Sequence, residues 1–365
     1  MRLGIIGLPN SGKTTIFNAL TGQNIETTIY PNPIGEEPHI GMINVPDKRI
    51  DRLSAIFKPK KTIYADVRCV DITGFSKGIS GSHQKTSVFN QIWDVDAIIH
   101  VVRAFDEPEV AHPDRDIDPV RDASTLELEL IFNDLELIEK RLERIAEATK
   151  KGLGKNLDAE KKLLTRCNAH LEDERPLRNL QFSEDELKLI RPMQFASLKP
   201  ELVVLNVSEK DIKGGKTEEA INRLREYFKG KDALVFSLCG KIEMELSQMP
   251  QDEAVLFLSD LGIEEPAMNM VIKEAYELLG LISFFTVGED EVRAWTIGNG
   301  INAVKAAGKI HSDIERGFIR AEVIGYEDFM NVGGMVKAKE KGMLRLEGKD
   351  YIVKDGDIIN FRFNV

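Results

Sequence analysis

Short apolar runs alternate with polar, helix-like segments over much of the chain. Residues 3–6 (Leu-Gly-Ile-Ile) form the first run, which ends at Gly7 and precedes a helical stretch from Lys13 to about Leu20. The other runs that favour strands are residues 40–45, 66–71, 97–102, 202–205 and 233–236. Most runs are continuously apolar, which is typical of parallel strands that are covered on both faces. With helical segments between them, these runs predict a doubly wound α/β domain.

A heptad pattern interrupts this alternation and predicts an inserted pair of helices. Apolar residues spaced by three and four form its seam: Leu128, Ile131, Leu135, Ile138, Leu142 and Ile145. The faces around the seam carry Glu127, Glu129, Glu136, Glu139, Lys140, Arg141, Glu143 and Arg144. After the helix breakers Gly152 and Gly154, a second helical run places on one face Leu157, Leu164, Cys167 and Leu171. We expect a helical hairpin, a coiled-coil arm that projects because its outward faces are so charged. A pair of helices lying flat on the domain is the alternative.

The C-terminal segment has a third pattern, which predicts a small α+β module from about residue 281. It follows a helical stretch at residues 268–279, and the spacing of Ser183 and Glu186 predicts one more short, capped helix upstream. Strands are favoured at residues 284–287, 294–297 and 318–324, with a strand, a turn and a strand over 351–363. The predicted domains are an α/β domain at residues 1–123 and 199–280, a helical insertion at 124–198 and a C-terminal domain at 281–365.

Composition bounds the partners of the chain. Of its 365 residues 42% are hydrophobic and 30% charged, and the formal net charge is −11, which argues against general coating of nucleic acid. Two basic stretches, residues 58–61 and 337–341, are candidates for RNA contact, although a solvated loop face is the simpler interpretation. The sequence has no apolar run of membrane-spanning length, no signal-peptide pattern at its start, and three cysteines without metal-ligand spacing. We expect a cytoplasmic protein that does not bind membranes.

The first apolar run leads into a phosphate-binding pattern, Gly7-x4-Gly12-Lys13-Thr14. The glycines let backbone N–H groups converge on a phosphate, and the following helix presents the positive end of its dipole. We expect Lys13 to reach the β and γ oxygens of a nucleoside triphosphate and the Thr14 hydroxyl to ligate Mg²⁺. Chance matches to this pattern occur, but its place between a strand and a helix favours the functional interpretation.

A second motif, Asp71-Ile72-Thr73-Gly74, stands at the end of a later apolar run. In P-loop proteins an acidic residue at this place holds Mg²⁺, usually through water, and the N–H of the glycine can touch the γ-phosphate. Phe75 follows directly, where Ras-type GTPases have the glutamine that positions the attacking water. Because phenylalanine cannot orient a water, catalysis must use another group or be slow without a partner.

A third motif, Asn206-Val207-Ser208-Glu209, stands where a GTPase normally has Asn-Lys-x-Asp to read guanine. Glu209 and Val207 stand in place of the Asp and Lys that recognise guanine. A site that loses the acceptor geometry for the guanine donors has a relaxed or changed base specificity. Asn206 can still pair with the N6/N7 edge of adenine. We expect the loop Ser237-Leu238-Cys239, after the next strand, to wall the base.

Together these residues resemble the YchF/Obg-like ATPase family of translation-factor-class P-loop proteins. The resemblance covers nearly the whole chain and rests on residues 7–15 (GLPNSGKTT), 71–75 (DITGF), 206–209 (NVSE), 257–295, 305–324 and 346–365. The last two segments look like the family's C-terminal TGS-type β-grasp module, and the heptad insertion is similar to its coiled-coil arm.

The resemblance implies an ATP-preferring molecular switch that hydrolyses slowly, requires Mg²⁺ and binds ribosomes or the large ribosomal subunit through the arm and the C-terminal module. It also implies that a loop histidine replaces the missing glutamine, and His112 matches that position. Without the resemblance, His112 reads as a surface loop histidine. The nucleotide-binding residues expected from motifs and resemblance are Asn10, Ser11, Gly12, Lys13, Thr14, Thr15, Gly74, Asn206, Val207, Glu209, Ser237, Leu238 and Cys239.

The chain departs from the family in both switch regions. At residues 30–38, Ile34 or Gly35 stands near the place of a threonine that serves the metal, and residues 78–86 replace the Gly-rich stretch of switch II. Within them His83 and Gln84 are candidate catalytic substitutes, although mobile polar loop residues are the simpler interpretation. These changes indicate a divergent paralogue and leave nucleotide-dependent switching open.

Two other functions fit the residues. A nucleotide-gated binding protein with incidental hydrolysis is favoured by Phe75 and the altered switch loops, and an Obg-class GTPase depends on the relaxed reader at Glu209. Asn10 raises a further alternative for the ions, because a P-loop asparagine there ligates K⁺ in some related proteins.

Overall fold

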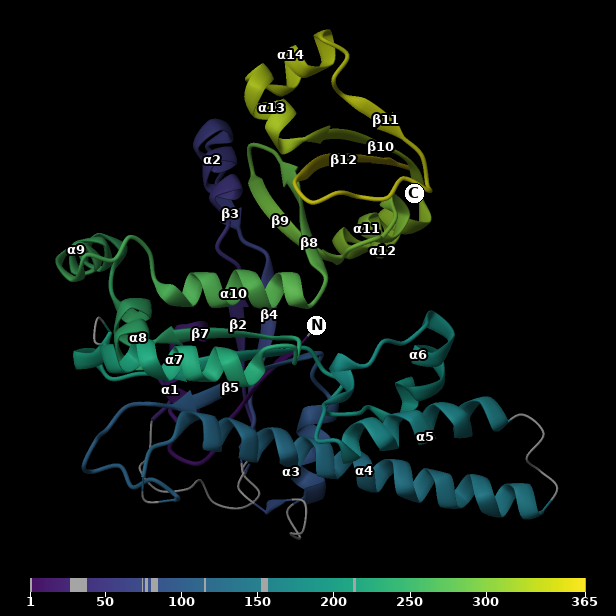
Figure 1. The fold of residues 1–365 in the computed structure, drawn as a ribbon. Helices are drawn as coiled ribbons and strands as arrows, with labels where there is room; N and C mark the ends of the chain where they lie inside the picture. Colours follow the sequence, from purple (N-terminus) through teal and green to yellow (C-terminus); the bar gives the residue numbers. More distant parts are fainter. Residues whose placement is uncertain are drawn as a thin grey trace. The chain divides into compact units, whose positions relative to one another are not determined.

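The computed structural model describes residues 2–26, 38–73, 75, 78–79, 85–114, 116–151, 157–212 and 215–364. The chain forms two compact units (Figure 1). The first unit comprises Met1–Gly41 and Arg68–Val271, and the second comprises Met42–Val67 and Ile272–Val365. The sequence predicts residues 42–67 as part of the α/β domain, whereas the structure groups them with the C-terminal segment.

The first unit contains the elements that the apolar runs predict. In chain order they are β1 (Arg2–Ile6), α1 (Lys13–Thr21), β2 (His39–Asn44), β4 (Asp66–Asp71), α3 (Lys85–Trp93), β5 (Ala97–Arg103), α4 (Pro119–Lys150), α5 (Asp158–Glu172), η2 (Leu177–Asn179), α6 (Glu184–Ile190), η3 (Arg191–Met193), β6 (Glu201–Asn206), η4 (Glu209–Asp211), α7 (Gly215–Phe228), β7 (Ala233–Leu238), α8 (Gly240–Gln248), α9 (Gln251–Leu261) and α10 (Ala267–Leu278).

A six-stranded sheet in the order β2-β4-β1-β5-β6-β7 is the centre of the first unit. The pairs β1–β4, β1–β5, β5–β6 and β6–β7 are parallel, and every residue of β5 and β6 is buried, as their continuous apolar runs predict. Phe89 of α3 and Leu126 and Leu130 of α4 pack against Ile6 and Ile98 of the sheet. The carboxyl ends of β1, β4, β5 and β6 therefore lead into the predicted phosphate, metal and base loops.

The heptad seam forms the core of a helical hairpin. Ile131, Ile138 and Ile145 of α4 are buried with Leu164 and Cys167 of α5, so the predicted pairing of the two helices is confirmed. The expected short helix is α6, where Ser183 and Glu186 form both bonds of a capping box. In Figure 1 the C-terminal part of α4 and all of α5 extend away from the sheet.

Two charged residues of the heptad region differ from the prediction. Glu127 and Glu129 were expected on outward faces, but they are 1% and 6% exposed. Both lie in the part of α4 that packs on the sheet. There Glu129 accepts a hydrogen bond from the backbone N–H of Gly78 at 2.5 Å, and Glu127 is held by cationic side chains.

Glu127 belongs to a group that we call the arm-base cluster, which consists of His100, Glu127, Arg178, Glu201, Tyr227 and Lys231. Glu127 accepts from Arg178 Nη2 at 2.5 Å, Lys231 Nζ at 2.8 Å and Tyr227 Oη at 2.9 Å. Glu201 contacts Arg178 Nη2 and lies 2.8 Å from His100 Nδ1. Burial alone would raise the pKa of Glu201, but the charge of Arg178 and the His100 contact outweigh it and hold that pKa at about 2.

The second unit is a mixed sheet in the order β11-β10-β12-β8-β9-β3 with short helices. Its elements are α2 (Lys48–Phe57), β3 (Lys61–Ile63), β8 (Leu281–Val287), β9 (Glu291–Gly298), α11 (Ala303–Ile310), α12 (Ser312–Arg316), β10 (Phe318–Gly325), α13 (Tyr326–Val332), α14 (Met335–Glu340), β11 (Arg345–Glu347) and β12 (Asp357–Phe363). The strand predicted at residues 351–353 is a single β-bridge from Ile352 to Asn302.

Residues 42–67 are integral to the second unit. Strand β3 pairs in parallel with β9, and Phe57 of α2 stacks on Phe329 at 5.7 Å between ring centroids. Arg49 donates to Asp355 Oδ2 at 2.5 Å and lies over the ring of Phe285 at 5.2 Å. This unit is thus assembled from two segments of the sequence.

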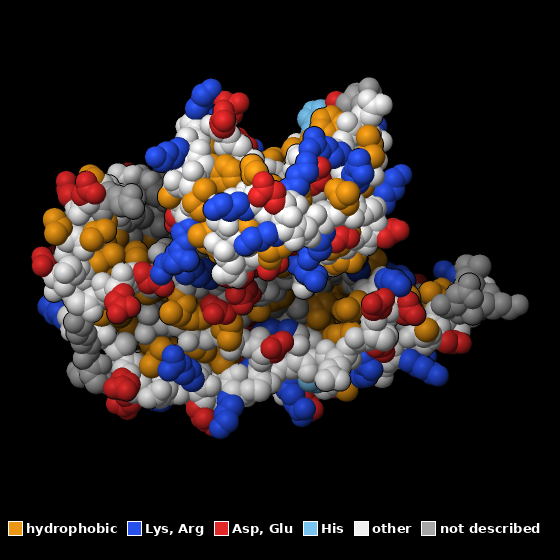
Figure 2. Space-filling model, turned by 90° about the horizontal axis from the view of Figure 1, so that it is seen from above, with side chains coloured by type: hydrophobic (Ala, Val, Ile, Leu, Met, Phe, Trp, Pro, Cys, Tyr) orange, Lys and Arg blue, Asp and Glu red, His pale blue; other side chains and the backbone are white. Residues whose placement is uncertain are grey.

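The surface and the cysteines agree with the composition. Figure 2 shows Lys and Arg interspersed with Asp and Glu over the visible face. In the basic stretch 58–61, Lys60 pairs with Asp290 at 2.7 Å, while Lys337 and Lys339 lie in the last turn of α14. All three cysteines are buried free thiols. No helix among the described residues is both long and apolar enough to cross a bilayer.

Candidate nucleotide-binding site

The loop between β1 and α1 depends on glycine at two positions. A Cβ on Gly7 would lie 2.5 Å from the carbonyl oxygen of Val101, and one on Gly12 would lie 2.2 Å from Asn206 Nδ2. Gly12 also has φ +92°, in the left-handed region. Only glycine therefore allows β5 and β6 to approach the loop this closely.

Lys13 begins α1 and folds back across the loop. Its Nζ donates to the carbonyl oxygen of Leu8 at 3.1 Å. Burial lowers the pKa of Lys13, and the nearby Asp71 carboxylate opposes that shift. The ammonium is thus positioned at the loop that the glycines shape, and Thr14 and Thr15 follow it in the first turn of α1.

Thr14 and Asp71 form a pair of oxygen donors at the ends of α1 and β4. Thr14 Oγ1 donates to Asp71 Oδ2 at 2.9 Å, and Asp71 is 1% exposed. In the described part of the chain, Asp71 Oδ1 is buried without a hydrogen-bond partner. Hydroxyl and carboxylate oxygens suit Mg²⁺, which one or two protein ligands and phosphate oxygens commonly hold. Accordingly, no cluster of three or more metal-ligating His, Cys, Asp or Glu residues is present among the described positions.

The Asn206 side chain connects the P-loop to the start of α8 through both ends of its amide. Its Nδ2 donates to the Ser11 carbonyl oxygen at 3.1 Å, and its Oδ1 accepts the N–H of Gly240 at 2.9 Å. The side chain joins the P-loop to the start of α8 and is buried. One amide N–H and one lone pair of Asn206 are outside these two bonds, and its pairing with the adenine edge stays a prediction.

The other predicted base-loop residues divide by exposure. Val207, Leu238 and Cys239 are buried, and the N–H of Val207 donates to the Leu238 carbonyl at 2.9 Å. Glu209 is exposed at the start of η4, and Ser237 is half-buried at the end of β7. Among the side chains expected to meet the base, Glu209 is therefore the most accessible.

Phe75 is a core residue. It is 1% exposed and packs edge-to-face on Phe89 at 6.2 Å between centroids. Since its ring lies in the apolar cluster beneath the sheet, it cannot position a water, as the sequence predicts. Gly74, Ile34, Gly35, His83 and Gln84 lie outside the described residues.

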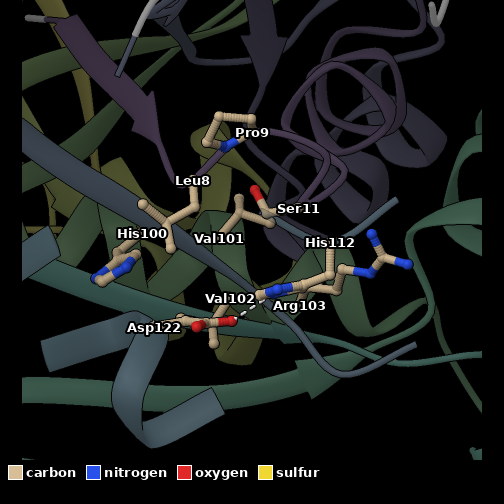
Figure 3. A pocket seen from close by; sticks show the side chains of 9 residues that line it. All are labelled: Leu8, Pro9, Ser11, His100, Val101, Val102, Arg103, His112 and Asp122. Atoms are coloured by element: carbon tan, nitrogen blue, oxygen red, sulfur yellow. Dashed lines mark hydrogen bonds and ion pairs between the residues drawn. The ribbon is translucent and has the colours of Figure 1, made fainter. Parts of the chain in front are cut away.

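His112 is buried, in contrast to the surface loop histidine that its own residues suggest. Its side chain and that of Asp122 are each 5% exposed, and Nε2 lies 2.8 Å from Asp122 Oδ2. Figure 3 shows the ring turned toward this carboxylate. The two residues line a small cavity under the P-loop together with Leu8, Pro9, Ser11, His100, Val101, Val102 and Arg103.

Arg103 and Asp122 are site residues that the sequence did not single out. Arg103 Nη2 donates to the Val110 carbonyl at 2.8 Å, and the guanidinium lies over Phe105 at 4.4 Å from its centroid. Asn10 Nδ2 donates to the Ala111 carbonyl at 3.0 Å. The bond from Arg103 holds the loop of His112 against β5, and the bond from Asn10 ties it to the P-loop. An arginine as the last residue of the largely apolar, buried strand β5 was the available signal for Arg103.

Two family models match parts of the chain. The family model MMR_HSR1, described as "50S ribosome-binding GTPase", matches residues 2–134. The model YchF-GTPase_C, described as "Protein of unknown function (DUF933)", matches residues 281–364.

Similar proteins span the whole chain. The "Ribosome-binding ATPase YchF" of Bacillus subtilis is 44% identical, and the match covers 99% of each chain. The protein of the same name from Escherichia coli O157:H7 is 40% identical over 100% of this chain and 99% of its own. The structure of the Schizosaccharomyces pombe YchF GTPase superposes with a TM-score of 0.85 at 30% identity, covering 99% of this chain and 97% of that one. The chain belongs to the YchF family of P-loop proteins.

Proposed function

We propose that this protein is a slow, Mg²⁺-dependent ATPase switch that binds ribosomes in the cytoplasm. The observation that carries the proposal is the pairing of Thr14 Oγ1 with Asp71 Oδ2, at the end of a glycine-shaped loop, while the other Asp71 oxygen accepts no hydrogen bond from a described residue. Relatives at 40–44% identity are named ribosome-binding ATPases, which supports ATP as the nucleotide and the ribosome as the partner.

In this proposal each loop contacts a different part of the nucleotide, the metal ion or the attacking water. Backbone N–H groups of residues 10–15 and the Lys13 ammonium bind the phosphates, while Thr14 and Asp71 hold Mg²⁺. Bound Mg²⁺ supplies positive charge to the β and γ oxygens. Val207, Glu209 and the 237–239 loop surround the base, and His112 assists the attack of water in place of the residue that Phe75 replaces.

The base assignment is tested by calorimetric titration of the full chain with ATP and with GTP, each with and without Mg²⁺. We expect tighter binding of ATP that requires Mg²⁺. Glu209→Ala should reduce the ratio of the two affinities, whereas Lys210→Ala, a change at the adjacent exposed position, should not. A preference of the unmodified protein for GTP would overturn the ATP assignment in favour of an Obg-class GTPase.

Ribosome association is tested by co-sedimentation in the ATP-bound and ADP-bound states. We expect a nucleotide-dependent difference and faster single-turnover hydrolysis when ribosomes are present. Removing the charges of Lys337 and Lys339 tests whether α14 contributes an RNA contact. Equal hydrolysis with and without ribosomes would favour a nucleotide-gated binding protein in which hydrolysis is incidental, the second candidate that the buried Phe75 supports.

The ion requirement has its own test. Asn10 uses its amide N–H on Ala111, which leaves its carbonyl oxygen as the group to ligate K⁺. Exchange of K⁺ for Na⁺ should then slow hydrolysis in the unmodified protein and have no effect in Asn10→Ala. An unchanged rate in the unmodified protein would remove K⁺ from the proposal.

A further inference from the structure

Both ring nitrogens of His112 are engaged in the structure. The backbone N–H of Asp114 donates to Nδ1 at 3.1 Å, and Nε2 lies 2.8 Å from Asp122 Oδ2. Since a backbone N–H can only donate, Nδ1 carries the lone pair and Nε2 carries the proton that is donated to Asp122. In this position the imidazole has no nitrogen left to accept a proton from a water at the γ-phosphate.

Asp122 is stabilised as an anion independently of His112. It lies in the first turn of α4, near the positive end of the helix dipole. Its Oδ1 accepts from Arg121 Nε at 3.1 Å and Nη2 at 3.0 Å. If the His112 ring moves away, the Asp122 carboxylate therefore keeps Arg121 as its partner. The ring then loses its charge-assisted hydrogen bond from Nε2 to Asp122.

The segment before His112 is fastened to the P-loop and to the end of β5. Ala111 accepts from Asn10 Nδ2 at 3.0 Å, and Val110 accepts from Arg103 Nη2 at 2.8 Å. Asn10 belongs to the loop proposed to bind the phosphates, so nucleotide in that loop acts directly beside the bond to Ala111. The position of His112 is thus held by the hydrogen bonds of its ring and by those of the two residues before it.

We propose that Asp122 is a positioning residue that holds His112 in a resting position and thereby limits unaided ATP hydrolysis. The proposal rests on the proposed function, in which His112 assists hydrolysis. A hydrogen bond to a charged group changes the ratio of two states by about ten- to a hundredfold, so its loss should release the ring in a correspondingly larger fraction of molecules.

The test is single-turnover hydrolysis of Mg²⁺-ATP by the full chain and its variants. Asp122→Ala should accelerate hydrolysis by about tenfold with unchanged ATP affinity. Asp122→Asn, which preserves the packing and offers a weaker acceptor, should give a smaller acceleration and carries the test if Asp122→Ala fails to fold. The matched control is Asp116→Ala, since Asp116 also pairs with Arg121, at 2.8 Å, and has no bond to His112; its rate should be unchanged.

A double variant separates release of His112 from a general loosening of the loop. His112→Ala combined with Asp122→Ala should lose the whole acceleration. In ¹⁵N NMR spectra, His112 of the unmodified protein should show the Nε2–H tautomer, and Asp122→Ala should populate the Nδ1–H form.

The outcomes distinguish the holding role of Asp122 from the proposed role of His112 in hydrolysis. A rate that falls or stays constant in folded Asp122 variants overturns the holding role, because Asp122 then supports His112 or does not affect it. Loss of hydrolysis in His112→Ala without acceleration in Asp122→Ala overturns the holding role alone. Unchanged hydrolysis in His112→Ala overturns the proposed task of His112 and the holding role with it.

Discussion

Two groups of buried polar side chains on the same sheet differ in how fully their hydrogen-bonding capacity is used. In the arm-base cluster, Glu127 accepts three hydrogen bonds, from Arg178, Lys231 and Tyr227. At the P-loop, Asp71 accepts from Thr14 on one oxygen and has no partner for the other within the described residues. Leaving a buried carboxylate oxygen unpaired is costly.

The difference indicates different purposes for the two groups. Glu201 Oε2 also lacks a hydrogen-bond partner among the described residues, but the Arg178 guanidinium contacts it. A carboxylate that already has its cation stabilises the fold, whereas one with an open oxygen gains when a cation binds. Changes in the arm-base cluster should therefore alter stability and spare nucleotide affinity, and changes at the P-loop should do the reverse.

The largest effect is expected from Arg178→Met. Removing this guanidinium leaves Glu127 with two partners and Glu201 without its cation, which should lower the free energy of unfolding by about 3–5 kcal/mol. Urea unfolding measures the change, and titration with Mg²⁺-ATP should give the unmodified affinity. Arg175→Met is the control, since the exposed Arg175 forms an ion pair with Asp173 and with no other described residue, and it should change stability by less than about 1 kcal/mol.

Acid should weaken the arm-base cluster through Glu201. The pKa of Glu201 is about 2 in the folded protein, against 4.5 as its ordinary value. A carboxylate whose folded pKa is depressed stabilises the fold above its unfolded pKa, and that contribution is lost as pH falls from about 4.5 toward 2. The loss amounts to about 3 kcal/mol at most.

Urea unfolding at pH 5.5, 4.5 and 3.5 measures this contribution. Glu201→Gln should have lower stability at pH 5.5 and a shallower decline toward pH 3.5 than the unmodified protein. Equal slopes for the two proteins would contradict the assignment of the decline to Glu201.

Lys13→Ala tests the other side of the comparison. We expect ATP affinity to fall by about 10- to 100-fold, because charge-assisted bonds to the phosphates are lost. Within the part of the chain that the structure describes, the Lys13 side chain donates one hydrogen bond, to Leu8, so the free energy of unfolding should change little. Calorimetric titration and urea unfolding measure the two quantities. A loss of stability as large as that in Arg178→Met would remove the distinction between the two groups.

The smallest effect is expected from Tyr227→Phe. The change removes one of three donors to Glu127 and leaves the ring beneath Lys231, whose Nζ lies 3.6 Å from the ring centroid. The free energy of unfolding should fall by about 1 kcal/mol. A decrease similar to that of Arg178→Met would show that the bonds to Glu127 are not independent.

The sequence predicted the parts of the fold that depend on local periodicity. Continuous apolar runs located β1, β5 and β6, and the heptad spacing located the pairing of α4 with α5. The burial of Glu127 could not be predicted in this way, because its partners Arg178 and Lys231 come from positions 51 and 104 residues away. A helix pattern shows which face is charged and not which opposing charges the fold brings to it.

The candidate site was predictable to the same extent. The glycine spacing identified the phosphate loop, and Thr14 and Asp71 meet as their motifs predict. Asn206 was assigned to the base from its motif alone. Its bonds to Ser11 and Gly240 could not be predicted, because only the tertiary structure brings these residues together. His112 and Asp122 are ten residues apart, but no local pattern indicates that their loop and helix fold against each other.

The composition of the second unit from Met42–Val67 and Ile272–Val365 has a consequence for biosynthesis. About 200 residues separate the two segments, so at 5–20 residues per second the ribosome needs roughly 10 to 40 s between them. During that time Phe57 and Arg49 of α2 lack their contact partners from the second segment, because Phe329, Phe285 and Asp355 have not yet been synthesised. The N-terminal part of the nascent chain thus carries an unpaired helix until translation is almost complete, and a prematurely terminated chain never buries it.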